Sequence, residues 1–269
     1  MQPSILNPSR PIDTERFGGL GRLYGRAALE RLARAHVAVI GVGGVGSWTA
    51  EALARSGVGR LTLIDMDDVC ITNTNRQLPA LEGEIGRPKV EVLAERIRRI
   101  NPGCAVEAVT KFFLESTADR LLCPACQPFD WVVDAVDRMS IKALLITKAR
   151  ALDISVLTVG GAGGRRDATQ VRCGDLGATG GDALLRQVRR ELRHTHGWAV
   201  GRGAAFNVPA VYSAEPQVFP QSDGTVCATK EAGENLRMDC ASGYGAACFV
   251  TGAFGFAAAG EVVRRIAEK

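Results

Sequence analysis

Several features that mark other classes of protein are missing from this sequence of 269 residues. Its 33 Lys and Arg residues nearly balance 29 Asp and Glu residues, and a net charge of +4 does not by itself indicate a nucleic-acid-binding protein. Residues 1–17 contain no continuous apolar core of signal-peptide length. There is no internal repeat, low-complexity tract or clear linker, so we expect residues 1–269 to form one domain.

Cysteines are scattered along the chain, at positions 70, 104, 123, 126, 173, 227, 240 and 248. Together with the missing signal-peptide core, this scatter indicates a reducing, cytoplasmic location. Cys123 and Cys126 have metal-ligand spacing, but a second C-x-x-C is missing, and we expect no structural zinc. A monovalent cation, Na⁺ or K⁺, held by loop carbonyl groups would leave no mark in the sequence and stays open.

One uncharged segment approaches the length of a membrane span. Residues 240–260 form a run of 21 uncharged residues that includes five glycines and many alanines. This composition is only weakly hydrophobic, and an amphipathic charged tail follows directly. We expect a buried helix packed on a sheet and no membrane partner.

The first 160 residues alternate between strand and helix patterns. Strands are expected at 36–41, 60–65, 105–113, 131–136 and 155–161, and helices at 45–57, 87–101, 115–122 and 142–153. Near-continuous apolar strands separated by helices are typical of a parallel sheet covered on both faces. We predict an α/β, Rossmann-like, doubly wound fold, with a nucleotide-binding part at 30–160 and a C-terminal elaboration at 161–269.

A glycine-rich loop, GVGGVG, directly follows the first expected strand. Gly41, Gly43 and Gly46 have the G-x-G-x-x-G spacing of a phosphate-binding turn, and Gly44 adds a position where a ligand can approach the backbone. Asp65, at the end of the second strand, is placed to accept hydrogen bonds from a ribose. A nicotinamide dinucleotide and ATP explain these residues equally well.

Charged and polar side chains in the next loops favour ATP. Asn73, Arg76 and Lys89 follow the ribose-binding position, where cations neutralise a polyphosphate that is about to be cleaved. Asp137, after the fourth strand, is a candidate Mg²⁺ ligand. Each could be an ordinary surface charge, but the set in one crevice predicts a site for ATP and Mg²⁺.

These motifs resemble a known superfamily. GVGGVG, LIDMDDVCITNTNRQ, GRPKVE and DAVD are similar to motifs of the adenylating enzymes related to ubiquitin-activating E1, the HesA, MoeB and ThiF group. Segments 16–25, 43–59, 159–170, 220–228 and 237–247 resemble one branch, the tRNA threonylcarbamoyladenosine dehydratases. The resemblance extends over nearly the whole chain.

The resemblance implies ATP-dependent dehydration of N6-threonylcarbamoyladenosine at position 37 of tRNA, through an acyl-adenylate, to the cyclic form. It assigns Asp65 to the ribose, and Asn73, Arg76 and Lys89 to the phosphates. Asp137 would position Mg²⁺, and Arg76, Lys89 and Asp137 would be the catalytic residues. A homodimer and contact with a cysteine desulfurase or sulfur-acceptor system are also implied, with AMP and pyrophosphate as products.

Two family features are altered or ambiguous in this chain. An N-terminal R-x-x-R pair in the superfamily reaches into the partner's ATP site, but Gly19 stands where the second arginine is expected. Arg16 and Arg22 are therefore both candidates for the arginine that acts in trans. Cys240 matches a family motif and is a candidate reactive cysteine, although a small buried residue before the last helix explains it equally well.

Arginines recur on one face of the helix expected at 183–194. Arg186, Arg189, Arg190 and Arg193 have the spacing i, i+3, i+4 and i+7, and Arg165 lies in a flanking loop. We interpret them as contacts to tRNA phosphates, which position the RNA without reading its bases. A solvated helix face is the alternative, and no DNA partner is expected.

Three other functions stay open. An adenylyltransferase for the C-terminal Gly-Gly of a sulfur-carrier protein would share the ATP site. A nicotinamide-dependent dehydrogenase would use the same glycine loop and Asp65. A non-catalytic tRNA-binding or sulfur-relay scaffold would leave ATP uncleaved.

Overall fold

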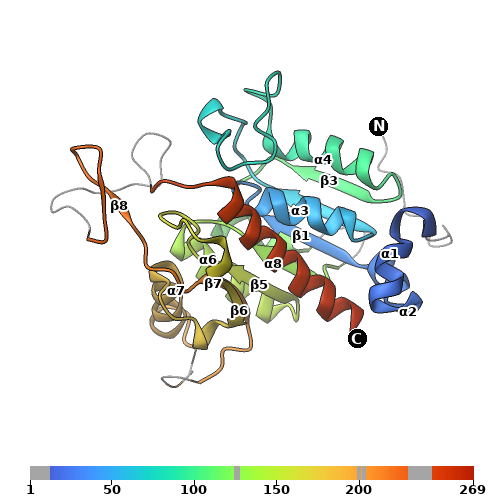
Figure 1. Cartoon of the computed structure of the whole chain (residues 1–269). Helices are drawn as coiled ribbons and strands as arrows, with labels where there is room; N and C mark the ends of the chain where they lie inside the picture. The colour runs from blue at the N-terminus through green and yellow to red at the C-terminus, as the bar shows by residue number, and fades with distance from the viewer. Residues whose placement is uncertain (1–12, 124–127, 199–200, 202–203, 230–243) are drawn as a thin grey trace.

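A seven-stranded sheet forms the centre of the computed structural model, which describes residues 13–123, 128–198, 201, 204–229 and 244–269 (Figure 1). Its strands are β1 (His36–Ile40), β2 (Arg60–Ile64), β3 (Ala105–Val109), β4 (Trp131–Asp134), β5 (Ser155–Val159), β6 (Val171–Asp175) and β7 (Pro209–Ser213). They lie in the order β3-β2-β1-β4-β5-β7-β6. Neighbouring strands are parallel except β6 and β7, which pair in antiparallel fashion at one edge.

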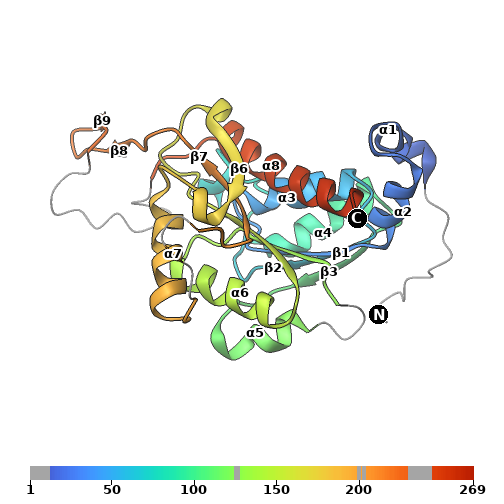
Figure 2. The same ribbon diagram turned by 90° about the horizontal axis from the view of Figure 1, so that it is seen from below.

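Helices cover both faces of this sheet (Figure 2). One face carries α2 (Arg26–Arg34), α3 (Gly46–Arg55), α4 (Lys89–Ile100) and α8 (Cys248–Ala267), and the other carries α5 (Glu115–Leu122), α6 (Met139–Ala151) and α7 (Ala183–His194). Because strand side chains alternate, Val37 and Val39 of β1 enter one apolar cluster, and Ala38 and Ile40 enter the other. The predicted doubly wound α/β fold is confirmed.

Short elements complete the described chain. They are the helix α1 (Thr14–Tyr24), the 3₁₀ turns η1 (Ile71–Asn73), η2 (Ala168–Gln170) and η3 (Leu176–Ala178), and the paired strands β8 (Phe219–Pro220) and β9 (Val226–Cys227). The strand expected at 105–113 is shorter, because β3 ends at Val109 and the chain then turns toward α5. The antiparallel edge formed by β6 follows a glycine-rich stretch that gave no clear strand pattern.

The apolar C-terminal segment forms most of the long helix α8, and residues 240–243 lie outside the described part. A Cβ atom on Gly255 would lie 2.6 Å from the Trp48 Cβ atom, so α8 and α3 approach each other closely. Phe254, Ala258 and Val262 of α8 are fully buried against the sheet. The buried helix is confirmed for the described residues, in which no helix is long and apolar enough to cross a membrane.

A buried ion pair lies at the carboxyl end of β4. Lys142 of α6 and Asp134 of β4 are both 0% exposed, with 3.0 Å between Nζ and Oδ2. Thr158 of β5 donates its hydroxyl to the same Asp134 oxygen at 2.6 Å and accepts a hydrogen bond from Lys142 Nζ at 3.3 Å. The other Asp134 oxygen accepts the Val136 N–H at 3.3 Å. The pair therefore fixes the start of the loop that leaves β4.

Removing one member of this pair should destabilise the fold strongly. Lys142→Met leaves Asp134 as a buried charge without its counter-ion, which costs about 3–5 kcal/mol of unfolding free energy. Asp134→Asn combined with Lys142→Met removes both charges, keeps an oxygen acceptor, and should recover most of this loss. The measurement is urea denaturation, read as a shift in midpoint at constant slope.

Lys148→Met is the matched control on the same helix. Lys148 pairs with Glu115 and Asp119, whose side chains are 73% and 77% exposed, so its loss should cost less than about 1 kcal/mol. Equal destabilisation by Lys142→Met and Lys148→Met would contradict a special role for the buried pair.

Candidate active site

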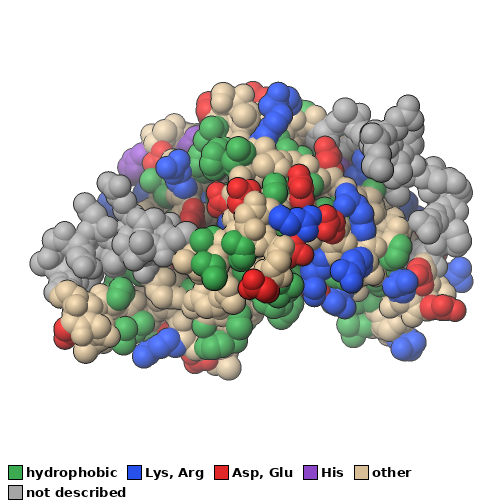
Figure 3. All heavy atoms as spheres, turned by 90° about the horizontal axis from the view of Figure 1, so that it is seen from above, with side chains coloured by type: hydrophobic (Ala, Val, Ile, Leu, Met, Phe, Trp, Pro, Cys, Tyr) green, Lys and Arg blue, Asp and Glu red, His purple; other side chains and the backbone are tan. Residues whose placement is uncertain are grey.

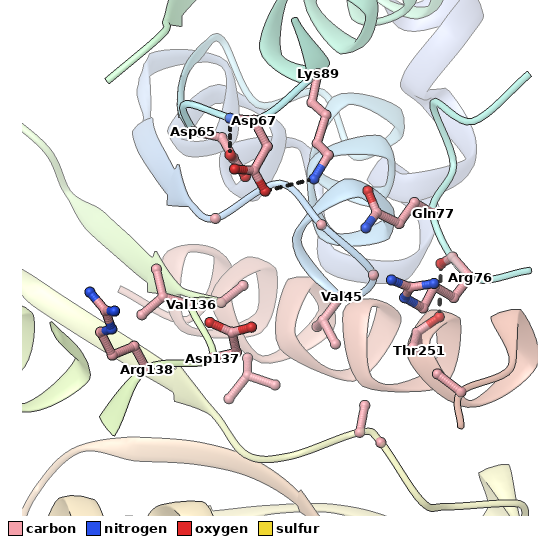
Figure 4. Close-up of a pocket in the computed structure, with 18 of the residues that line it drawn as sticks. Val45, Asp65, Asp67, Arg76, Gln77, Lys89, Val136, Asp137, Arg138 and Thr251 are labelled. Carbon is pink, nitrogen blue, oxygen red and sulfur yellow. Dashed lines mark hydrogen bonds and ion pairs between the residues drawn. The ribbon is translucent and has the colours of Figure 1, made fainter. Parts of the chain in front are cut away.

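A cavity of about 1120 Å³ opens at the carboxyl ends of the central strands (Figure 4). Its wall includes Gly41 after β1, Asp65 after β2, Asp137 after β4 and Gly160 after β5. β1 lies between β2 and β4, and connections leave these strands toward opposite faces of the sheet. This is a topological switch point, and ligands of open α/β sheets bind at such points. The topology therefore places the sequence motifs around one cavity.

The glycine loop forms one wall of this cavity. Gly41 has a φ of +83°, and a Cβ atom on Gly46 would lie 1.8 Å from the Gly41 carbonyl oxygen. These two glycines let the turn close. Gly43 and Gly44 line the cavity together with Gly41, whereas Gly46 begins α3 behind them. The first turn of α3 thus offers its N–H groups and positive dipole end to an anion.

Asp65 is held rigidly beside the glycine loop. Its carboxylate accepts the Val42 N–H at 2.7 Å and the Asp67 N–H at 2.9 Å. Burial raises the pKa of this carboxyl, against the opposing effects of the Asp67 N–H and of Lys89. Each oxygen keeps a lone pair that can accept a hydrogen bond from a ligand hydroxyl.

Lys89 reaches the cavity from the first residue of α4. Its side chain is 6% exposed, and Nζ lies 2.9 Å from Asp67 Oδ2 (Figure 4). Asp67 itself is 58% exposed, so it holds the ammonium group in place without burying it completely. Asp67 is not among the site residues expected from the sequence, where its signal is the acidic run DMDD at 65–68.

Arg76 lies on the opposite side of the cavity, clamped by two helices. Its carbonyl oxygen accepts hydrogen bonds from Trp48 Nε1 of α3 at 3.2 Å and Thr251 Oγ1 of α8 at 3.0 Å. Its guanidinium donates to the Thr72 carbonyl at 2.7 Å and to Asn75 Oδ1 at 3.0 Å. The guanidinium is therefore oriented in the cavity wall before any ligand is bound.

Asn73 is not brought into the cavity with these cations. It is 3% exposed, and its side-chain oxygen accepts the Cys70 N–H at 3.1 Å, which shapes the turn η1. Gln77 lines the cavity one turn later, and Figure 4 shows it between Lys89 and Arg76. Its buried Oε1 has no hydrogen-bond partner among the described residues. Gln77 is thus an amide residue of this loop that joins Arg76 and Lys89 in the cavity wall, although it is only 9% exposed.

Asp137 faces the cavity from the loop after β4, across from Lys89 and Arg76 (Figure 4). Asp134, three residues earlier, does not line the cavity, because its carboxylate is buried in the ion pair with Lys142. The described residues contain no group of three or more His, Cys, Asp and Glu that could hold a metal ion alone. The donor set fits Mg²⁺ that arrives with a polyphosphate, because Mg²⁺ needs only one or two carboxylates beside phosphate oxygens.

The C-terminal third supplies part of the cavity wall. Tyr244 and Ala246 line the cavity from the segment that leads into α8, Thr251 lines it from α8 itself, and Leu184 lines it from α7. Asn75 Nδ2 donates to the Ala246 carbonyl at 2.8 Å and joins this segment to the Arg76 loop. No sequence pattern indicates these contacts, because they join residues about 170 positions apart.

The arginines expected to bind tRNA separate into two groups, and two of them need correction. Arg165 is only 2% exposed, and burial lowers the pKa of its guanidinium. Arg189 donates to the Leu176 carbonyl at 3.1 Å and to the Thr179 hydroxyl. Arg165 donates to the Gly181 carbonyl at 3.0 Å, so both side chains make hydrogen bonds to the segment before α7, and Arg189 keeps only part of its surface exposed.

The other three arginines of this set lie closer to solvent. Arg186 and Arg190 are exposed on α7, and no ion pair holds either of them among the described residues. Arg193 is half-buried and lies over the Phe206 ring at 5.0 Å. Of the expected set, Arg186 and Arg190 are therefore the two arginines that are exposed.

The candidate trans arginines lie away from the cavity. α1 lies at the end of the sheet opposite the site (Figure 1). Arg16 pairs with Asp13 at 2.8 Å and donates to the Ile100 carbonyl at 3.3 Å, whereas Arg22 is exposed. Cys240 and Cys126 lie outside the described residues, and Cys123 is exposed.

Comparison of the sequence with known proteins identifies the family of the chain. The model of the ThiF family matches residues 19–269. The tRNA threonylcarbamoyladenosine dehydratase of Escherichia coli (strain K12) is 48% identical over 256 residues, which cover 95% of this chain and 94% of that protein. The sulfur carrier protein adenylyltransferase of Thermus thermophilus is 36% identical over 116 residues, 43% of this chain and 41% of that protein.

The fold matches solved structures to the same extent. Crystal structures of the E. coli dehydratase in complex with AMP and with ATP have TM-scores of 0.83, with 42% and 41% sequence identity. In both, the match covers 96% of this chain and 97% of the other. The chain therefore belongs to the ThiF family, in the branch of the tRNA threonylcarbamoyladenosine dehydratases.

Proposed function

We propose that the protein dehydrates N6-threonylcarbamoyladenosine at position 37 of tRNA, using ATP, and gives the cyclic nucleoside. The observation that carries the proposal is the convergence of Asp65, Arg76, Lys89 and Asp137 with the glycine loop on one cavity. Likeness to dehydratases over 95% of the chain supports it, whereas the sulfur-carrier adenylyltransferase matches only 43%. That second activity shares the ATP site and differs in its acyl substrate.

In the proposed reaction, the threonyl carboxylate attacks the α-phosphate of ATP and pyrophosphate leaves. The carbamoyl group of the same nucleoside then attacks the acyl-adenylate, the ring closes and AMP departs with the carboxylate oxygen. The overall change in the nucleoside is the loss of one water. No external nucleophile is needed, because both reacting groups belong to one side chain.

The charged residues of the cavity that the sequence singled out each have a role in this reaction. Asp65, fixed by two backbone N–H groups, would accept the ribose hydroxyls. Lys89 and Arg76 would bind the phosphates and stabilise the charge that develops on them. Asp137 would hold Mg²⁺ through water, and that ion would neutralise the departing pyrophosphate.

The exposed arginines of α7 support a tRNA substrate. α7 begins at the cavity, where Leu184 lines the wall, so Arg186 and Arg190 lie on the helix that leads away from the site. By contrast, Figure 3 shows a face where Lys and Arg side chains are mixed with Asp and Glu. Arg87 of the loop before α4 pairs with both Glu84 and Glu95. Arg186 and Arg190, which have no ion pair among the described residues, are better placed to bind RNA phosphates.

A homodimer would complete the site by adding an arginine from the partner. Neither Arg16 nor Arg22 reaches the cavity of its own chain, and Arg22 has no hydrogen bond or ion pair within the described residues. Arg22 is therefore the better candidate. The monovalent cation, the absence of zinc and the contact with a sulfur-transfer system stay predictions.

Replacing Asp137 tests the chemistry. Mass spectrometry of nucleosides from modified tRNA incubated with protein and Mg-ATP should show the loss of one water. Asp137→Ala should slow this change by about 100- to 1000-fold, because charge on the leaving phosphate is less well neutralised. Asp119→Ala, an exposed carboxylate of α5 outside the cavity, should react normally. Active protein that cleaves ATP without changing the nucleoside would refute the proposal. ATP cleavage that depends on a small sulfur-carrier protein would instead favour sulfur-carrier adenylation.

A charge reversal on α7 tests the RNA contact. Arg186→Glu with Arg190→Glu should weaken tRNA binding and leave ATP binding unchanged. For two lost phosphate contacts, the slope of log affinity against log salt concentration should fall by about 1.4 to 1.8. The control is Arg98→Glu with Arg99→Glu, two exposed arginines of α4. An unchanged salt slope for the α7 variant would remove α7 from the RNA-binding surface.

Mixing two variants tests the dimer. Arg22→Ala and Lys89→Ala should each be nearly inactive, since one removes the trans arginine and the other the cis lysine. Unfolding and refolding them together should restore about one quarter of the activity, because hybrid dimers hold one intact site. Activity that never rises above that of the separate variants would show that Arg22 does not act across an interface.

A further inference from the structure

The rim of the cavity carries an exposed apolar patch. Eleven large apolar side chains of the described residues are exposed, and four of them line this cavity: Met66 (44%), Ile71 (68%), Phe112 (56%) and Leu114 (37%). Met66 follows β2 and Phe112 follows β3, and these strands pair in parallel up to Ile64 and Val109. The segments that follow the two strands, with Met66 on one and Phe112 on the other, therefore lie side by side. Exposed apolar patches with polar surroundings mark binding surfaces.

The rim is distinct from the inner apolar wall of the cavity. Ile40, Ile64 and Phe113 line the interior beside Asp65, and they are 1%, 1% and 5% exposed. This wall gives a nucleotide base a sheltered surface next to the ribose-binding carboxylate. The cavity of about 1120 Å³ also exceeds the range of roughly 300–1000 Å³ that suits one small ligand. The nucleotide therefore does not need Phe112, and this ring at the rim can contact a second ligand.

The backbone that carries Phe112 is fixed before any ligand arrives. Thr117 of α5 donates its hydroxyl to the Phe112 carbonyl at 2.8 Å and accepts the Leu114 N–H at 2.9 Å. The Lys111 N–H donates to the Val109 carbonyl at 3.0 Å. An exposed ring on an ordered loop can bind with little loss of conformational entropy.

A positive charge stands next to this ring. Lys111 is exposed and lines the cavity, and Arg138 lines it from the loop after β4. Proteins bind unpaired RNA with this combination, in which a base stacks on an aromatic ring and a cation contacts the neighbouring phosphate. A protein or lipid partner would not need an aromatic ring beside a cavity that holds a nucleotide.

We propose that Phe112 is a stacking platform for an unpaired base of the tRNA loop next to the modified adenosine, and that Lys111 contacts the adjoining phosphate. The inference rests on the proposed function, because it takes modified tRNA as the ligand. The stacked base anchors the loop at the rim while the threonylcarbamoyl group extends inward to the α-phosphate. Phe112 then contributes to binding of the RNA and not to the chemical steps.

The test compares variants of the ring. Phe112→Ala and Phe112→Leu should each raise the Kd for modified tRNA by roughly 5- to 150-fold, because both lose the stacking surface. Phe112→Trp keeps that surface and should bind within about threefold of the wild type. It also adds a fluorophore, whose emission should be quenched by the RNA beyond any change seen for the native tryptophans. The KM for ATP should not change in any of these variants.

Phe249→Ala is the matched control, an aromatic residue 59% exposed that does not line the cavity. It should bind tRNA as the wild type does. Three results would overturn the proposal: unchanged tRNA affinity in Phe112→Ala, full affinity in Phe112→Leu, or a raised KM for ATP with tRNA affinity intact. The last result would assign the ring to the nucleotide.

The same experiment separates this inference from the proposed function. Wild-type protein that binds modified tRNA but never removes water from it would refute the function, and the Kd series would still measure the contribution of Phe112. Normal turnover by the wild type with no effect of Phe112→Ala on Kd would refute the inference and leave the function standing.

Discussion

In the turn between β1 and α3, a Cβ atom on Gly46 would lie 1.8 Å from the Gly41 carbonyl oxygen, and one on Gly41 would lie 2.9 Å from the Ala135 carbonyl oxygen. Backbone therefore packs directly on backbone where β1, α3 and the loop after β4 meet. Because no side chain fills this junction, the first turn of α3 faces the cavity and Asp137 comes within the same wall. The site depends on this close approach.

The charged side chains of the cavity are arranged around the same junction. The Asp134 and Lys142 charges neutralise each other inside the protein, so the loop after β4 presents a single carboxylate, Asp137, to the cavity. On the other side, Lys89 is held by Asp67, and the Arg76 loop is clamped by α3 and α8. The cationic side chains are oriented before the ligand arrives, which is the condition under which fixed charges stabilise a developing negative charge most strongly.

Two exposed surfaces adjoin this site. α7 starts at the cavity wall, and the exposed rim around Phe112 follows β3 on the other side. A macromolecule that inserted one side chain into the cavity would meet positive charge on α7 and an aromatic ring at the rim.

Much of the fold and part of the site could be predicted from the sequence alone. Apolar strand patterns, the glycine spacing, Asp65 and Asp137 after strand ends, and Arg76 and Lys89 in the intervening loops identified the edge of the sheet, because parallel strands end at one edge. Helical spacing placed four arginines on α7, yet only the tertiary structure decided that Arg189 turns inward to the η3 loop while Arg186 and Arg190 stay exposed. It likewise placed Gln77, and not Asn73, in the wall of the cavity. Periodicity reflects the geometry of one segment, whereas the partner of each side chain is set by segments distant in the chain that fold against it.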